Sequence, residues 1–324
     1  MRQATARVAV GVSLMAALAS GVARAEGDAP VDDRPIIQTY YPPPVDGPAL
    51  RLPEPPKRLY LDGAYAVSND LSALPYIAGK ATNFRFALGG TWRWGRFAVD
   101  AEIPFANVTT LNLTMVSGGA PNPTMQTGTA FGDIRVGGVW SERLAGEAAI
   151  AGIGLRTRLA THTTRFDFYM PQTYAPITDV FPYWFYIEPT AIFGGAIGRF
   201  TYVVNEGALV MIGPDGNILG MEVIVPTLMF WDSHVAVGYA PWDFLGGSVE
   251  LASDIQFNHP NDPQFPGSNG LQSIWVAPAL QVHVGDWRVD AIARIGIGSK
   301  SQAFGVLEYV GTDSYTLRLT RAFN

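Results

Sequence analysis

Apolar and polar residues alternate most regularly between residues 82 and 105. Before Gly95 every second residue is large and apolar or is glycine, and the alternation resumes after Arg96. A period of two predicts β-strands. The Gly95-Arg96 pair suits a two-residue type II′ turn, because glycine adopts the positive φ of its first position without strain. The stretch is therefore predicted to be a β-hairpin with one apolar face and one charged face.

A turn at Gly95-Arg96 also fixes the register of this hairpin. It pairs Trp94 with Phe97 on the apolar face and Gly89 with Glu102 on the other face. Two environments fit such a hairpin. In a soluble sandwich the apolar face is core, whereas in an outer-membrane barrel it meets lipid and the charged face lines the interior. The hairpin alone does not distinguish them.

Twelve alternating segments can be recognised after residue 57, and most approach the roughly 9 to 11 residues with which a tilted strand crosses a bilayer. The predicted strands are 58–67, 82–94, 97–105, 130–141, 146–160, 181–195, 199–211, 228–240, 245–257, 271–284, 287–299 and 313–323.

The connections between these segments are alternately long and short. The short ones are 95–96, 141–145, 195–198, 241–244 and 285–286. Outer-membrane barrels have short periplasmic turns and longer extracellular loops, and a soluble sandwich has no reason to alternate so regularly. The predicted fold class is therefore all-β: a transmembrane, antiparallel, up-and-down β-barrel of about 12 strands with a Pro-rich N-terminal extension.

Three stretches depart from the simple pattern. The connection 106–129 is uncharged and rich in Thr and Asn, so it is expected to be a solvated loop. Glu206 falls at an apolar position of its segment, which predicts either a bulge or a place above the membrane. The aromatic residues of the connection 161–180 are expected to pack on one another rather than to form a constriction.

Composition supports a lipid-facing barrel. Apolar residues make up 48% of the chain and charged residues only 15%, against about 25% charged in an average soluble domain. Five of the eight tryptophans lie at or beside the short connections, where they are expected to form a periplasmic-side girdle. These five are Trp92, Trp94, Trp140, Trp242 and Trp287.

The N-terminus has the pattern of a secretory signal. Arginines precede an apolar run over 8–22, and Ala23-Arg24-Ala25 offers a signal-peptidase site. We therefore expect a signal peptide at 1–25, a Pro-rich periplasmic linker at 26–57 and an outer-membrane β-barrel at 58–324. Loss of three arginines would change the formal charge from −6 to −9, and an acidic chain without a basic block is not expected to bind nucleic acid.

The expected linker holds nine of the 24 prolines, which favour extended polyproline II structure. Its composition favours a disordered spacer over a plug or a tether. At the other end of the chain, the last predicted strand closes on Phe323. A terminal aromatic residue is what outer-membrane barrels present to the barrel-assembly machinery, which is an expected partner together with outer-membrane lipid.

Inward-facing charge is the candidate functional chemistry. The candidate lumen-lining residues are Arg85, Arg93, Asp100, Glu102, Asp133, Arg135, Arg156, Arg158, Glu250, Asp254, Arg288, Asp290 and Arg294. They could form a polar conduit or ligand site, or they could neutralise one another in a filled interior. Neither an enzyme nor a metal or cofactor site is expected, because the four histidines show no catalytic or metal-ligand spacing and the chain has no cysteine.

The stretch Thr127-Gly-Thr-Ala-Phe-Gly-Asp-Ile, preceded by Ile103-Pro104-Phe105, resembles the outer-membrane proteins of the phenol-degradation meta-pathway family. That family is loosely similar to the long-chain fatty-acid transporter class. The resemblance implies a channel for small, often hydrophobic or aromatic molecules. The asparagine-proline-alanine hatch signature of the fatty-acid transporters is absent from 26–57.

Two functional hypotheses follow. The first is passive transport of a small-molecule solute through the barrel, and the second is a closed barrel that anchors or displays its loops.

Overall fold

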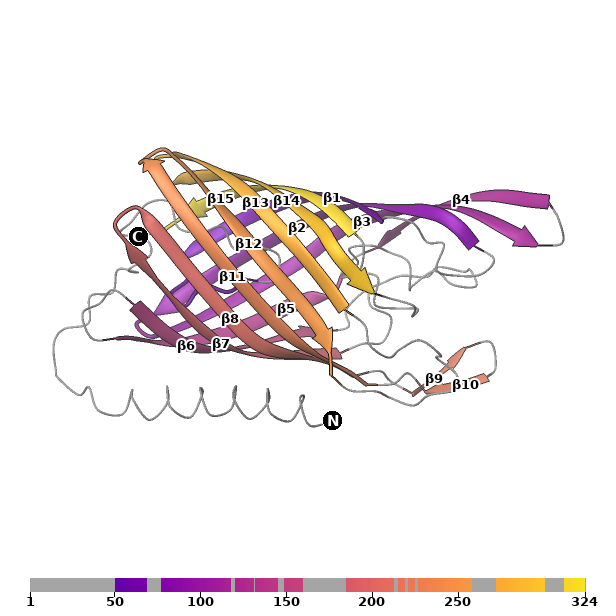
Figure 1. The fold of residues 1–324 in the computed structure, drawn as a ribbon, viewed down its shortest axis with the longest axis horizontal. Coiled ribbons are helices and arrows are strands. Elements are labelled where there is room, and N and C mark those ends of the chain that lie inside the picture. The colour runs from indigo at the N-terminus through magenta and orange to yellow at the C-terminus, as the bar shows by residue number, and fades with distance from the viewer. Residues whose placement is uncertain are drawn as a thin grey trace.

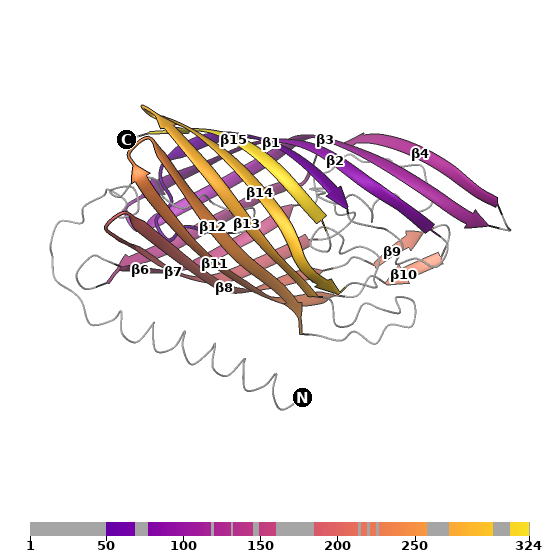
Figure 2. The same ribbon diagram turned by 45° about the horizontal axis from the view of Figure 1, so that its top comes forward.

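The chain forms a closed antiparallel β-barrel of twelve strands in the computed structural model, as the sequence pattern predicts (Figures 1 and 2). The structure describes residues 50–68, 77–117, 120–130, 132–144, 149–159, 185–212, 215–218, 221–224, 227–257, 272–300 and 312–323. The expected signal peptide and the connection 161–180 lie outside these residues. Within them, no helix is long and apolar enough to cross a membrane.

The barrel strands are, in chain order, β1 (Arg58–Ser68), β2 (Ile77–Trp94), β3 (Phe97–Ser117), β5 (Ile134–Arg143), β6 (Ala149–Leu159), β7 (Phe185–Ile197), β8 (Phe200–Ile212), β11 (Leu228–Trp242), β12 (Leu245–Gln256), β13 (Gln272–Val284), β14 (Trp287–Lys300) and β15 (Thr312–Ala322). Each pairs with its neighbours in the chain, and β1 pairs with β15 to close the wall. Three further strands lie outside this wall: β4 (Ala120–Ala130), β9 (Asp215–Ile218) and β10 (Met221–Ile224).

The β2–β3 hairpin has the predicted register. Trp94 pairs with Phe97 and Gly89 with Glu102, and Gly95 has a positive φ of 55°. The same turn chemistry recurs at Gly198 and Gly285, each with a φ of 59°. Because glycine carries no Cβ, it takes this backbone conformation at these tight turns without strain.

The prediction of a solvated loop over 106–129 is wrong. The strand β3 continues to Ser117 and pairs with β4, so that the two project beyond the barrel as a ribbon (Figure 1). Residues 97–102 of β3 instead pair with β5 in the wall. Threonine and valine favour extended structure, but a ribbon outside lipid needs no apolar face, and so it lacks the alternation that marks the other strands.

The outer surface of the wall is apolar, as expected for a lipid-facing barrel. Large apolar side chains that point outward from the strands are 38–73% exposed, which a water-soluble surface would not sustain over such an area. The five tryptophans expected in a girdle are 40–58% exposed, all near the predicted periplasmic turns. The structure therefore confirms that the five side chains point outward beside the short turns, and their role as a periplasmic-side girdle stays a prediction.

Glu206 lies on β8 with its side chain on the outward side of the wall. Residues 200–211 of β8 pair with β11 without a register shift, so the bulge considered from the sequence does not occur. Its carboxylate accepts hydrogen bonds from Trp231 Nε1 at 2.9 Å and from Ser233 Oγ at 2.6 Å. These two donors satisfy one of its oxygens on the outward side of the wall.

Candidate functional site

Residues 50–57, which come directly before β1, lie inside the barrel, and we call them the plug segment. Leu50 and Leu52 are buried, and they pack against inward-facing residues of five strands. These wall residues are Val139, Ile150, Ile192, Val203 and Ala236. The remaining residues of the expected linker lie outside the described part of the chain. Its last eight residues thus occupy the position of a plug rather than that of a spacer.

Arg51 anchors the first residues of the plug segment to the wall. Its Nη2 donates to Asp100 Oδ1 at 2.9 Å and to the carbonyl of Gly138 at 3.0 Å. Burial and the nearby Arg156 lower the pKa of the Arg51 guanidinium, and Asp100 opposes this. Because an arginine retains its charge over any ordinary pH range, the contact is a charge-assisted one.

The backbone of Arg51 is held as well. With its amide oriented to satisfy both partners, Asn205 accepts from the Arg51 N–H at 2.6 Å and donates to the Arg51 carbonyl at 3.0 Å. A single side chain thereby satisfies both backbone groups of a residue that has no strand beside it.

Glu54 fixes the plug segment nearer the periplasmic end. Its side chain is buried, and its Oε1 forms ion pairs with Nε of Arg143 at 3.0 Å and with Nη2 of Arg93 at 3.2 Å. Arg143 contacts both carboxylate oxygens. Such fork-shaped pairs fix orientation as well as position.

Two glycines of the wall leave room for Arg51. A Cβ on Gly137 would lie 2.8 Å from Arg51 Nη2, and one on Gly154 would lie 2.6 Å from Arg51 Nη1. A cavity of about 60 Å³ remains beside the plug segment, lined by residues that include Arg51, Tyr60 and Glu102. A space of this size holds a few water molecules.

Glu102 is the centre of a second group of buried charges, on the same strand as Asp100 and two residues beyond it. It pairs with Arg85, lies 3.4 Å from Arg135, and accepts a hydrogen bond of 2.9 Å from the Tyr60 hydroxyl. Beside it, Asp62 of β1 receives Arg318 of β15 through two hydrogen bonds of 2.7 and 2.9 Å. The Asp62–Arg318 pair thus links the first and the last strand of the barrel.

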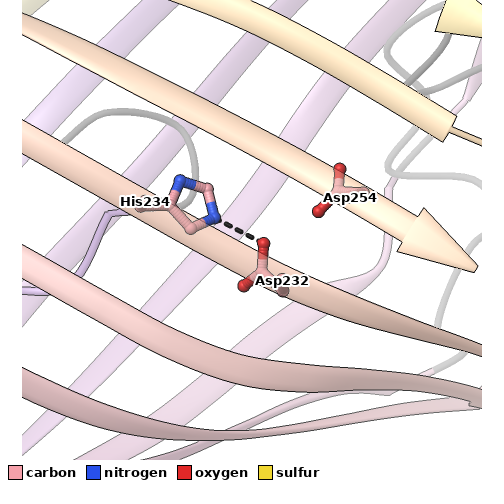
Figure 3. Close-up of side chains that lie close together, drawn as sticks. All are labelled: Asp232, His234 and Asp254. Carbon is pink, nitrogen blue, oxygen red and sulfur yellow. Dashed lines mark hydrogen bonds and ion pairs between the residues drawn. The ribbon is translucent and has the colours of Figure 1, made fainter. Parts of the chain in front are cut away.

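A third group surrounds His234 on β11 (Figure 3). Its Nε2 lies 2.5 Å from Asp232 Oδ1, and its Nδ1 lies 2.8 Å from Glu250 Oε1. Asp254 of β12 points toward the same space, and the ligand atoms of Asp232, His234 and Asp254 all lie within 4.8 Å of one another. All four side chains are at least nine-tenths buried.

Twelve of the thirteen predicted lumen residues lie on barrel strands and are buried or half-buried, and the structure brings most of them into these three groups. Arg85, Arg93, Asp100, Glu102, Arg135 and Arg156 surround the plug segment and Glu102, and Glu250 and Asp254 surround His234. Arg288 and Asp290 pair with each other, and Arg158 and Arg294 are buried. Asp133, expected on a strand, is buried in the break between β4 and β5.

Several residues of these groups were missed from the sequence. Asp232 is absent from the predicted lumen-lining residues, although it shares its inward parity with His234 and with Ala236. Asp62 and Arg318 also lie at inward positions of predicted strands. The alternation of inward and outward positions along these strands could therefore have identified both residues. Nothing in the Pro-rich composition of 50–57 points to Arg51 or Glu54.

Comparisons with known proteins support the fold. No protein-family model and no curated protein sequence matches the chain. Among solved structures, an outer membrane channel from Pseudomonas putida F1 superposes with a TM-score of 0.55 at 8% identity, covering 86% of this chain and 99% of that one. The translocator domain of the autotransporter NalP from Neisseria meningitidis has a TM-score of 0.46 at 9% identity, covering 83% of this chain and 89% of that one. The NanC porin has a TM-score of 0.47 at 11% identity, covering 82% of this chain and 99% of that one.

The chain therefore has the fold of outer-membrane β-barrels. Its apolar exterior and tryptophan girdle match the lipid environment in which such barrels reside. Both observations place it in the bacterial outer membrane.

Proposed function

We propose that this protein is an outer-membrane channel for the passive passage of small molecules and that the plug segment gates its lumen. The observation that carries the proposal is the way residues 50–57 are held. They contribute no strand to the wall, yet charged and polar contacts fix them across the lumen through Arg51 and Glu54. A barrel with a filled interior needs no separate segment with its own anchors.

The contacts of the plug segment suit a gate that can open. Its anchors are ion pairs and hydrogen bonds around a small apolar cluster, and every wall partner remains in a barrel whose ladder is complete without it. A segment outside the hydrogen-bonded sheet can leave without breaking strand pairing. Opening would expose the mixed charges of Asp100, Glu102 and Arg156 to a passing solute.

Small, in part hydrophobic or aromatic solutes are the class we propose. Support comes from the resemblance of 127–140 to the phenol-degradation meta-pathway family. The fold shared with the Pseudomonas putida channel is compatible with this class. The alternative is a closed barrel that anchors its loops, in which the plug segment would be permanent filling. We propose no enzymatic activity for either case.

Conductance in planar bilayers tests the gate. We compare the wild type with the double variant Arg51→Gln, Glu54→Gln, which removes both charged anchors while retaining similar volume. The expected result is a several-fold rise in open-channel conductance or open probability. The matched control is Arg199→Gln, which removes an exposed pair with Asp243 at a periplasmic turn.

Solute uptake into liposomes tests the passage itself. Phenol-sized aromatic solutes should enter faster through the double variant than through the wild type. If the double variant runs as a heat-modifiable folded barrel and yet neither conducts nor admits solute, the closed-barrel alternative is correct.

A further inference from the structure

We infer that Asp232, His234 and Asp254 form a binding site for one divalent transition-metal ion, such as Zn²⁺, inside the barrel. The sequence gives no metal-ligand spacing because the ligands come from two strands. Asp232 and His234 lie two residues apart on β11 and so point to the same side, and Asp254 is the cross-strand partner of Asp232 on β12. The register of the sheet thus assembles the site.

The histidine is oriented as a ligand would be. Glu250 Oε1 lies 2.8 Å from Nδ1, so a neutral imidazole would donate from Nδ1 to Glu250 and aim the lone pair of Nε2 at the two aspartates (Figure 3). A carboxylate behind a ligating imidazole is the usual second contact of metal-bound histidines, where it fixes the tautomer and raises the basicity of the ring.

The charge of the site favours a cation. Three buried carboxylates surround one imidazole. The Arg294 guanidinium stacks 4.3 Å over the Trp275 ring that itself packs against His234, and the charges of Arg156 and Glu188 also act on Asp232. Asp232 and Asp254 are hydrogen-bonded to each other, so a proton lies between the two carboxylates. A divalent ion would replace this proton and would balance the carboxylate charge inside the barrel.

One buried atom at the site lacks a partner in the described part of the chain. Glu250 is 3% exposed, and while its Oε1 contacts His234, its Oε2 makes no hydrogen bond. A carboxylate oxygen left without a donor beside the imidazole is available to a cation or to a water molecule bound to it. This observation is independent of the clustering of the three proposed ligands.

The geometry also defines what must move. Two ligand atoms on one ion, each about 2 Å from the metal, lie about 3 Å apart, whereas Nε2 and Asp232 Oδ1 are 2.5 Å apart. The proton that now joins these two atoms has to leave, and Asp232 has to withdraw by roughly half an ångström as the ion enters. The imidazole favours Zn²⁺ and similar late transition-metal ions over Ca²⁺ and Mg²⁺, which prefer oxygen ligands alone.

Zinc titration by calorimetry tests the site on the full-length barrel in detergent, without an affinity tag and after removal of bound metal with a chelator. We expect one Zn²⁺ per chain and no comparable binding of Mg²⁺. The variants Asp254→Asn and His234→Gln should each weaken Zn²⁺ binding by at least about 100-fold, and Glu250→Gln by about 10- to 100-fold. Asp243→Asn, at an exposed turn, is the control and should bind as the wild type does.

A spectroscopic measurement on the wild type covers the case in which a variant fails to fold. Pulsed electron paramagnetic resonance of the Cu²⁺-loaded chain should show coupling to one imidazole nitrogen. The inference is overturned if the wild type binds no stoichiometric Zn²⁺, if folded Asp254→Asn and His234→Gln barrels bind it unchanged, or if the Cu²⁺ signal shows no imidazole coupling. None of these outcomes depends on channel conductance. The metal-site inference and the proposed function are therefore tested independently.

Discussion

The guanidinium of Arg51 lies 2.9 Å from the carboxylate of Asp100, a residue 49 positions further along the chain and on the barrel wall. This contact ties a segment that belongs to no strand to the part of the wall where β3 pairs with both β2 and β5. The plug segment is therefore positioned by long-range charge rather than by sheet pairing.

Labelling of a single cysteine should report whether the plug segment is closed. The chain has no cysteine, so Leu52→Cys introduces one thiol at a side chain that is 2% exposed. A charged thiol reagent should modify it at least about tenfold more slowly than Asp243→Cys at an exposed turn, because protected groups react only from a minor open state. Adding Glu54→Gln to Leu52→Cys should speed the reaction. Equal rates at the two cysteines would contradict a closed plug segment.

Outward and inward substitutions should differ in their effect on barrel assembly. Ala101 lies at an outward, exposed position of β3 among lipid-facing residues, so Ala101→Arg is expected to cost roughly 2 to 4 kcal/mol. Thr320 is buried on the inner side and its hydroxyl has no partner in the described part of the chain, so Thr320→Val should be neutral or slightly stabilising. Heat-modifiable mobility on gels after refolding measures the difference. Equal assembly of the two variants would show that the faces are assigned incorrectly.

Removal of the Glu102 charge should be costly despite its inward position. Glu102→Gln leaves Arg85 and Arg135 buried without their shared carboxylate, and the loss of one partner from a buried pair typically costs 3 to 5 kcal/mol. Denaturant unfolding followed by tryptophan fluorescence should show a clearly lowered midpoint. The matched change Glu142→Gln removes a pair with the half-exposed Arg96 and should cost no more than about 1 kcal/mol.

The periplasmic turns should be selective for residues that tolerate positive φ. Gly285 has a φ of 59° and nothing within 4 Å of the place of a Cβ, so only its backbone conformation restricts substitution. Gly285→Asn should be nearly neutral, whereas Gly285→Val should cost about 1 to 2 kcal/mol. Urea midpoints of the two variants provide the comparison, and a tolerated valine would mean that the turn can relax.

The wall could be predicted from sequence because successive side chains of each strand point alternately toward lipid and toward the barrel interior. Trp92 and Arg93 are neighbours in the chain, yet one is half-exposed on the lipid side and the other is buried inside, and that contrast recurs along β12 and β14. The ribbon of β3 and β4 could not be predicted in this way, because both of its faces lie outside the wall.

The interior was predicted only in part, for a related reason. Parity identifies which charges point inward but not which of them meet, since Glu102 and Arg135 become neighbours through pairing of β3 with β5. The partners of Glu54 lie 39 and 89 residues away, and no local pattern in a Pro-rich segment encodes them. Asp232 was not predicted to line the lumen, and its partner His234, which lies 2.5 Å away, was not predicted there either.

The plug segment is joined to β1 without an intervening linker, and this sets how it can move. The carbonyl of Lys57 accepts a 2.9 Å hydrogen bond from the N–H of Phe323, so the base of the segment is fixed to the last strand. Eight extended residues reach at most about 29 Å from such a pivot. In the proposed gate, Arg51 would remain at a high effective concentration beside its own binding surface after release. Reclosure is therefore intramolecular, and its rate should not depend on how much of the protein the membrane contains.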